Sequence, residues 1–224
     1  MPAAKSLFRD EAHRAPSQDA RPALEIEPGA MLLRGFAARE ERALVAAIAK
    51  IAKAAPFRHM VTPGGFRMSA AMTNCGRAGW VTDRTGYRYD ACDPESGRPW
   101  PEMPDIFTDL AAWAASEAGY PDFRPESCLI NRYEPGARMS LHQDRNERDF
   151  GQPIVSVSLG LPAIFLFGGL KRADRPQRIA LHHGDVVVWG GPARLRFHGV
   201  APLAEGAHSL LGRCRINLTL RNYS

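Results

Sequence analysis

From Ser127 onward the chain is a series of short strand-like segments, and this pattern limits the fold more than any other feature of the sequence. Each segment carries apolar residues and is bounded by Gly, Pro or Asp. The segments recur at close spacing, at 127–133, 153–159, 163–167, 177–181, 185–189, 195–200 and 214–221. Short strands at this density are typical of an all-β barrel or sandwich, so the expected class is mainly β with helices packed outside.

Two helices are expected in the first half of the chain. Apolar residues recur at helical spacing through the Ala-rich segment 37–55, and the pattern stops before Pro56. The segment 104–119 follows the same pattern, with Pro104 at its start and Gly119 at its end. Both helices are expected to cover the β-structure from outside.

The remaining parts of the first half are expected to be loops. Residues 57–98 are rich in Gly and aromatic residues, and we interpret them as short hairpins and loops over the core, a plausible substrate lid. Residues 1–23 are polar with no apolar period, and they predict a flexible arm. A chain of 224 residues suits one domain with a sizeable core, which is expected to span 24–224.

Composition excludes several classes of protein. No apolar run approaches the roughly 18 residues that a membrane span needs. The N-terminus lacks the apolar core of an export signal, so a cytoplasmic protein is expected. Cys75, Cys92, Cys128 and Cys214 are widely spaced, which fits reduced thiols better than structural zinc.

The net charge of +5 gives the protein a modest tendency to bind polyanions. A monomer is expected, because no exposed apolar helix face stands out.

A His-x-Asp pair, His142 and Asp144, follows the first of the predicted strands. In an extended segment the two side chains point to one side, because residues i and i+2 share a face. Two imidazoles and one carboxylate form the facial triad that holds Fe(II) and leaves positions open for a cosubstrate and dioxygen. His198 is the favoured third ligand, although spacing alone leaves His182 and His183 open. The pattern therefore predicts oxidation chemistry.

The last predicted strand carries a second polar pattern. Strand alternation puts Arg215, Asn217, Thr219 and Arg221 on one face of this segment. Guanidinium groups bind carboxylates bidentately and keep their charge, so two arginines on one face suit a ligand with two carboxylates. A dicarboxylate beside a three-ligand iron indicates 2-oxoglutarate.

Several motifs follow one another in a fixed order along the chain. They are TNCG at 73–76, CLINRYEPG at 128–136, LHQD at 141–144, PIVSVSLGLPA at 153–163, FGGLKR at 167–172, HGDVVVWGG at 183–191 and CRINLTLR at 214–221. On these motifs the sequence closely resembles the AlkB family of Fe(II)- and 2-oxoglutarate-dependent nucleic-acid dealkylases, above all its bacterial members. The resemblance covers nearly everything after residue 24.

The resemblance implies a double-stranded β-helix, or jelly-roll, core with an N-terminal nucleotide-recognition lid at about 57–98. It implies Fe(II) on three catalytic ligands, with 2-oxoglutarate and O2 as cosubstrates. The implied metal ligands are His142, Asp144 and His198. The implied 2-oxoglutarate contacts are Arg215, Asn217 and Tyr133 at the distal carboxylate, and Asn131 and Arg221 at the end that chelates the metal. From the residues alone, Asn131 and Tyr133 could equally be ordinary strand residues.

The lid residues have two interpretations. Trp80, Tyr87 and Tyr89 could each be a plain core aromatic. Together in a Gly-rich stretch with arginines, they also suit base stacking and phosphate contact. The AlkB resemblance implies that Trp80 stacks on the damaged base opposite His142, and that Tyr87 and Arg172 contact the nucleotide or its neighbours.

One position departs from the pattern of the bacterial family members. Two residues after the metal-binding aspartate, they have an acidic residue that helps read the exocyclic amino group of the base. This chain has Asn146 there. Asparagine still accepts a hydrogen bond but carries no charge, so we expect an altered lesion preference.

The expected function is oxidative demethylation of 1-methyladenine and 3-methylcytosine in DNA, single-stranded in the first place, with double-stranded DNA or RNA as further substrates. Formaldehyde and succinate are the expected products. One alternative is a 2-oxoglutarate oxygenase that acts on a protein or a small molecule, because the fold and the iron site do not fix the substrate. Another is a non-catalytic nucleic-acid-binding module, in which binding would survive loss of His142.

Overall fold

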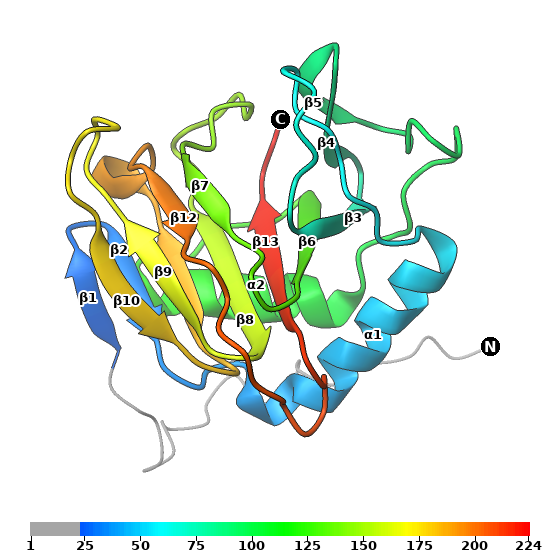
Figure 1. The fold of residues 1–224 in the computed structure, drawn as a ribbon. Coiled ribbons are helices and arrows are strands. Elements are labelled where there is room, and N and C mark those ends of the chain that lie inside the picture. Colours follow the sequence, from blue (N-terminus) through cyan, green and yellow to red (C-terminus); the bar gives the residue numbers. More distant parts are fainter. Residues whose placement is uncertain (1–22) are drawn as a thin grey trace.

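Two antiparallel sheets lie face to face in the computed structural model, which describes residues 23–224 (Figure 1). The larger sheet has the strand order β1-β2-β11-β8-β13-β6-β3, and the smaller has the order β10-β9-β12-β7. The bounds in the larger sheet are β1 Leu24–Glu27, β2 Ala30–Leu33, β11 Val186–Trp189, β8 Ile154–Gly160, β13 Arg215–Arg221, β6 Ser127–Tyr133 and β3 Ala71–Gly76. Those in the smaller sheet are β10 Gln177–Leu181, β9 Ala163–Phe167, β12 His198–Val200 and β7 Met139–His142. This is the expected jelly-roll architecture.

The two helices, α1 (Glu41–Ala54) and α2 (Asp105–Glu117), cover the outer face of the larger sheet. Side chains alternate between the two faces of β13, and the apolar ones lie on this outer face. Ile216, Leu218 and Leu220 pack in one apolar cluster with side chains of both helices. Two 3₁₀ turns, η1 (Ala38–Glu40) and η2 (Gly191–Ala193), complete the helical elements of the described residues. Neither helix is long and apolar enough to cross a membrane.

The inner face of β13 is polar although it is fully inside the protein. Arg215, Asn217, Thr219 and Arg221 are all less than a tenth exposed. Burial of four polar side chains on one strand is costly unless they have partners. The space between the two sheets is therefore where a polar ligand would be expected.

A separate hairpin stands at one end of the sandwich. Strands β4 (Gly79–Asp83) and β5 (Gly86–Asp90) form a two-stranded sheet of their own, next to the C-terminus in Figure 1. This hairpin belongs to the segment 57–98 that was expected to be hairpins and loops. The same segment also contains β3, which instead pairs with β6 as an edge strand of the larger sheet.

Several boundaries differ from the sequence expectations. The strands β1, β2 and β7 were not assigned from the sequence, and β12 covers only the last three residues of the expected 195–200. The first helix begins at Glu41, after the 3₁₀ turn η1 and not at residue 37. The expected arm 1–23 lies outside the described residues, apart from Ala23.

Candidate active site

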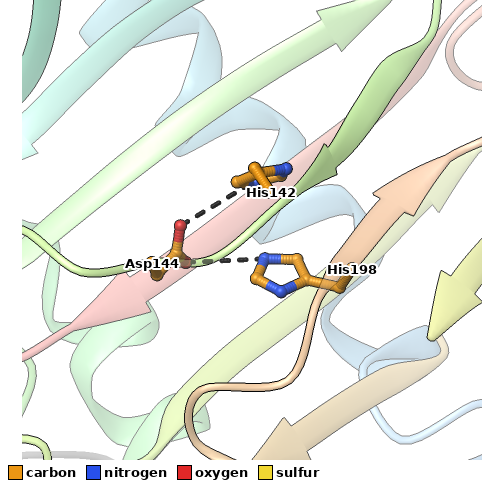
Figure 2. Close-up of side chains that lie close together, drawn as sticks. All are labelled: His142, Asp144 and His198. Atoms are coloured by element: carbon orange, nitrogen blue, oxygen red, sulfur yellow. Dashed lines mark ion pairs between the residues drawn. The ribbon is translucent and has the colours of Figure 1, made fainter. Parts of the chain in front are cut away.

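Three side chains meet where the smaller sheet faces the larger one (Figure 2). His142 ends β7, Asp144 lies in the loop after it, and His198 begins β12. The register of the two strands places His198 directly opposite His142. The two Nε2 atoms lie 3.6 Å and 3.7 Å from the Asp144 carboxylate oxygens, and the ligand atoms of all three lie within 4.8 Å of one another. One metal ion could bind all three.

The ionisation states of Asp144 and His198 suit a bound cation. Burial alone would raise the pKa of Asp144, but the Arg221 guanidinium and the two histidines outweigh it and hold that pKa below its ordinary value. Burial and the neighbouring His142 lower the pKa of His198 to about 4. The cluster therefore offers a carboxylate and a neutral imidazole at pH 7, which are the protonation states that a metal requires.

The neighbouring histidines were alternatives to His198, and the structure places them elsewhere. His183 Nε2 lies 2.8 Å from the Glu41 carboxylate, and His183 Nδ1 accepts a hydrogen bond from the Gly160 amide. His182 is exposed. Among the described residues, the metal-sized group of side chains contains His198 and neither of these two.

A buried guanidinium lies on the facing sheet. Arg215 is 1% exposed, and its Nη2 donates to the Ser158 hydroxyl. Its Nε and Nη1 have no hydrogen-bond partner, and the same is true of the buried Asn131 Oδ1. Burial lowers the pKa of Arg215, while the Tyr133 phenol raises it. Unpaired donors on a buried cation are costly, so the site fits a bound carboxylate.

Asn217 and Arg221 share the inner face with Arg215. The Asn217 amide donates to the Ser156 hydroxyl and to the Val157 carbonyl. Unlike Arg215, Arg221 has hydrogen-bond partners for its guanidinium: its Nε and Nη2 donate to Asp144 Oδ2 at 2.9 Å and 2.6 Å. Arg221 thus fixes the orientation of the Asp144 carboxylate, the candidate metal ligand.

Comparison with known proteins agrees with this geometry. The model of the 2OG-Fe(II) oxygenase superfamily matches residues 29–221. Alpha-ketoglutarate-dependent dioxygenase AlkB of Escherichia coli (strain K12) is 57% identical over 204 residues, which is 91% of this chain and 94% of that protein. The chain belongs to the AlkB family of 2OG-Fe(II) oxygenases.

Two more distant members of the AlkB family extend the comparison. DNA N(6)-methyladenine demethylase ALKBH1D of Arabidopsis thaliana is 30% identical, over 97% of this chain and 54% of that protein. A solved structure, "The structure of OsALKBH1", is 27% identical, with a TM-score of 0.80 over 90% of this chain and 100% of that one. The resemblance inferred from the sequence is confirmed.

AlkB-family enzymes need Fe(II), 2-oxoglutarate and O2. The chain has a candidate binding site for Fe(II) and one for 2-oxoglutarate. The His-Asp-His group matches the facial triad of non-haem iron oxygenases. The unpaired donors of Arg215 match a carboxylate ligand beside it. This chain is therefore an Fe(II)- and 2-oxoglutarate-dependent dioxygenase.

The β4–β5 hairpin reaches the loop after Asp144 through two aromatic side chains. Trp80 Nε1 donates to Asn146 Oδ1 at 3.0 Å, and the indole stacks on Tyr87 with ring centroids 5.7 Å apart. The Tyr89 hydroxyl donates to Glu147 Oε1 at 2.6 Å. Tyr87 is 48% exposed, so it is not a core aromatic.

Arg172 lies in the turn between β9 and β10. It is exposed, and its guanidinium lies 6.0 Å from the centre of the Phe197 ring, next to His198 in the chain. The lid arginine Arg88 is ion-paired with Asp83 and Asp90 within the hairpin.

Sequence reasoning missed three residues that support the site. Asn74 is fully buried on β3, where its amide donates to the Trp80 carbonyl and its oxygen accepts from the Trp80 amide. Glu147 and Arg194 form a buried ion pair at 3.2 Å, and Arg194 also donates to the Asp144 carbonyl. Charged loop residues are usually exposed, so nothing in the sequence marked this pair. For Asn74, its place within TNCG was the available signal.

Proposed function

We propose that this protein repairs alkylated nucleic acid by oxidative demethylation. The proposed substrates are 1-methyladenine and 3-methylcytosine in single-stranded DNA, with double-stranded DNA and RNA as further substrates. The observation that carries the proposal is the Trp80–Asn146 hydrogen bond, because it holds an aromatic ring two residues from the metal ligand Asp144. An indole in that position suits a flipped base better than a peptide or a small acid.

The proposed roles follow the geometry. His142, Asp144 and His198 would hold Fe(II), and Arg221 would keep Asp144 in place. Arg215, Asn217 and Tyr133 would bind the distal carboxylate of 2-oxoglutarate, with Asn131 and Arg221 at the other end. The buried Arg215 guanidinium lies over the Tyr133 ring, 5.2 Å from its centre, which supports a shared role for the two side chains.

The substrate contacts are proposed on the lid and on the β9–β10 turn. Trp80 would stack on the damaged base, and Asn146 would accept a hydrogen bond from its exocyclic amino group. Tyr87 and Arg172 would contact the nucleotide backbone or neighbouring bases, since both side chains are exposed. Tyr89 would hold the lid through Glu147.

Bound Fe(II), 2-oxoglutarate and O2 supply the oxidant for the N-methyl carbon, with succinate and carbon dioxide as coproducts. The protein positions the base and keeps water out. Ile154 and Trp189 are fully buried behind the cluster, and the Trp189 ring lies 5.0 Å from that of His198. The hydroxylated methyl group would then leave as formaldehyde, which restores the base.

The test is mass spectrometry of a short single-stranded oligonucleotide that carries one 1-methyladenine. It is incubated in air with the protein, Fe(II), 2-oxoglutarate and ascorbate. We expect loss of one methyl mass with the wild-type protein and none with His142→Ala or without 2-oxoglutarate. Succinate without demethylation of any methylated base would instead favour a protein or small-molecule substrate. Binding of the oligonucleotide without succinate would favour a non-catalytic module.

We also propose that the protein acts as a monomer in the cytoplasm. All four cysteines are free thiols, which supports a reducing compartment. Among the helical residues described, Trp113 is the one large apolar side chain that is exposed. Light scattering of the purified protein should give the mass of one chain, and a dimer mass would contradict the proposal.

A further inference from the structure

The last three residues of the chain continue from the end of β13 and lie beside the metal-binding loop, the loop that follows Asp144 (Figure 1). The backbone amides of Tyr223 and Ser224 donate to Glu126 Oε2 at 3.4 Å and 3.1 Å. The Tyr223 carbonyl accepts a hydrogen bond from the amide of Arg148 at 3.3 Å. The tail is therefore tied both to the segment before β6 and to the loop that follows Asp144.

This tail places an aromatic ring against the lid. Tyr223 stacks on Tyr89 of β5, with ring centroids 5.0 Å apart and planes 20° from parallel. In Figure 1 the C-terminus accordingly ends beside the β4–β5 hairpin. Offset stacks of this geometry are favourable beyond their buried area.

Tyr89 is held at its other end by the metal-binding loop. Its hydroxyl donates to Glu147 Oε1, and Glu147 is itself paired with Arg194. Burial raises the pKa of Tyr89, so the phenol stays protonated and remains a donor. One lid side chain is thus fixed between the C-terminal tail and the residues beside Asp144.

Other contacts of β5 run mainly within the hairpin. Tyr87 stacks on Trp80, and Arg88 pairs with Asp83 and Asp90. A further link joins the end of β5 to Trp100, whose Nε1 donates to the Asp90 carbonyl. Outside the hairpin, β5 is thus held by the stack of Tyr89 on Tyr223, the Tyr89–Glu147 hydrogen bond and the Trp100–Asp90 hydrogen bond.

We propose that Tyr223 is a positioning residue for the lid. By stacking on Tyr89, it keeps the β4–β5 hairpin over the metal-binding loop before substrate arrives, so that nucleic acid meets a preformed site. Tyr223 contacts none of the three proposed metal ligands, so its effect passes through Tyr89. As a statement about substrate binding, this inference rests on the proposed function.

Hydrogen–deuterium exchange of the free protein tests the positioning itself. The variants are Tyr223→Ala, which removes the ring, and Tyr223→Phe, which keeps the stacking ring and removes only the hydroxyl. We expect exchange in peptides covering 79–90 to be faster in Tyr223→Ala and unchanged in Tyr223→Phe. Equal exchange in Tyr223→Ala and the wild type would overturn the proposal.

Kinetics with the methylated oligonucleotide test the consequence for the reaction. Loss of one stacked pair corresponds to a rise of roughly two- to tenfold in KM. We expect this rise in Tyr223→Ala, with kcat and substrate-free succinate formation unchanged, and wild-type values in Tyr223→Phe. A fall in kcat, substrate-free turnover and Tm together would show a merely structural role and overturn the proposal. If no variant demethylates nucleic acid, the proposed function fails, and the exchange experiment still decides whether Tyr223 positions the lid.

Discussion

At the scale of single residues, Asn146 links strand β4 to the loop that follows Asp144. Its side-chain oxygen already accepts the indole N–H of Trp80, so the same amide would serve both the lid and the base. An aspartate in this position could make the same bond to Trp80 with a charged acceptor. The residue therefore separates two effects, the hydrogen bond to the lid and the negative charge beside the base.

Changing Asn146→Asp tests the second effect. Both methylated bases are cationic and carry an exocyclic amino group, but they present it differently to residue 146, so we expect the ratio of kcat/KM for 1-methyladenine to that for 3-methylcytosine to change roughly two- to tenfold. The measurement is demethylation of two oligonucleotides that differ only in the lesion. Asn146→Ala is the control, since it removes the acceptor for Trp80 and adds no charge. An unchanged ratio in Asn146→Asp, or the same change in both variants, would contradict the expectation.

The buried Arg194–Glu147 pair shows why a site like this one is only partly visible in a sequence. His142 and Asp144 were predicted as metal ligands from their spacing, and the structure brings both together with His198. His198 could be favoured over its neighbours His182 and His183, but only the pairing of β12 with β7 selects it. Charged side chains are usually exposed, so the sequence around Glu147 and Arg194 gives no sign that the fold buries them.

At the level of elements, the central strands were the most predictable part of the fold. Strands β6, β8 and β13 are seven residues long and buried throughout or nearly so, which makes their apolar pattern strong. Strands β1 and β7 have four residues each, and neither contains a buried residue. Short, partly exposed strands owe their conformation to their neighbours, so tertiary pairing decides them and local preference does not.

The lid hairpin depends on a close approach at the start of β4. A Cβ atom on Gly79 would lie 2.5 Å from Trp100 Cε2 and 2.7 Å from Asn74 Cβ. Trp100 is 5% exposed and Asn74 is fully buried, so neither side chain can move away freely. Only glycine lets the hairpin lie directly on these two residues.

We therefore expect Gly79→Ala to lower the free energy of unfolding by about 1–3 kcal/mol, as overpacking of a filled interior does. The Tm should fall by several degrees in thermal denaturation. Gly64→Ala is the matched control, because its Cβ would come no closer than 3.4 Å to the Phe66 ring. Equal Tm values for the two variants would show that the hairpin accommodates the methyl group.

Over the whole molecule, the metal and the cosubstrate would be held by different sheets. Two of the proposed metal ligands are on β7 and β12 of the smaller sheet, and the proposed 2-oxoglutarate contacts are on β6 and β13 of the larger one. A cosubstrate that chelates the metal would link the two sheets through non-protein atoms. Ligands that bind only the folded state stabilise it by mass action.

Thermal unfolding without oxygen should show this linkage. With Fe(II) and 2-oxoglutarate each near 100 times its Kd, we expect the Tm to rise by roughly 10–20 °C, and by more than the sum of the separate shifts. Arg215→Met should keep the shift from the metal and lose the addition from 2-oxoglutarate. His142→Ala should lose most of both. A shift with 2-oxoglutarate that does not depend on the metal would contradict a shared site.

The direct pairing of His142 with His198 has a consequence for the assembly of the protein. Side chains alternate along a strand, so a slip of one residue between β7 and β12 would turn one imidazole away from Asp144. A chain with this register error could not complete the three-ligand set. The capacity to bind iron would therefore report that β7 and β12 have paired correctly.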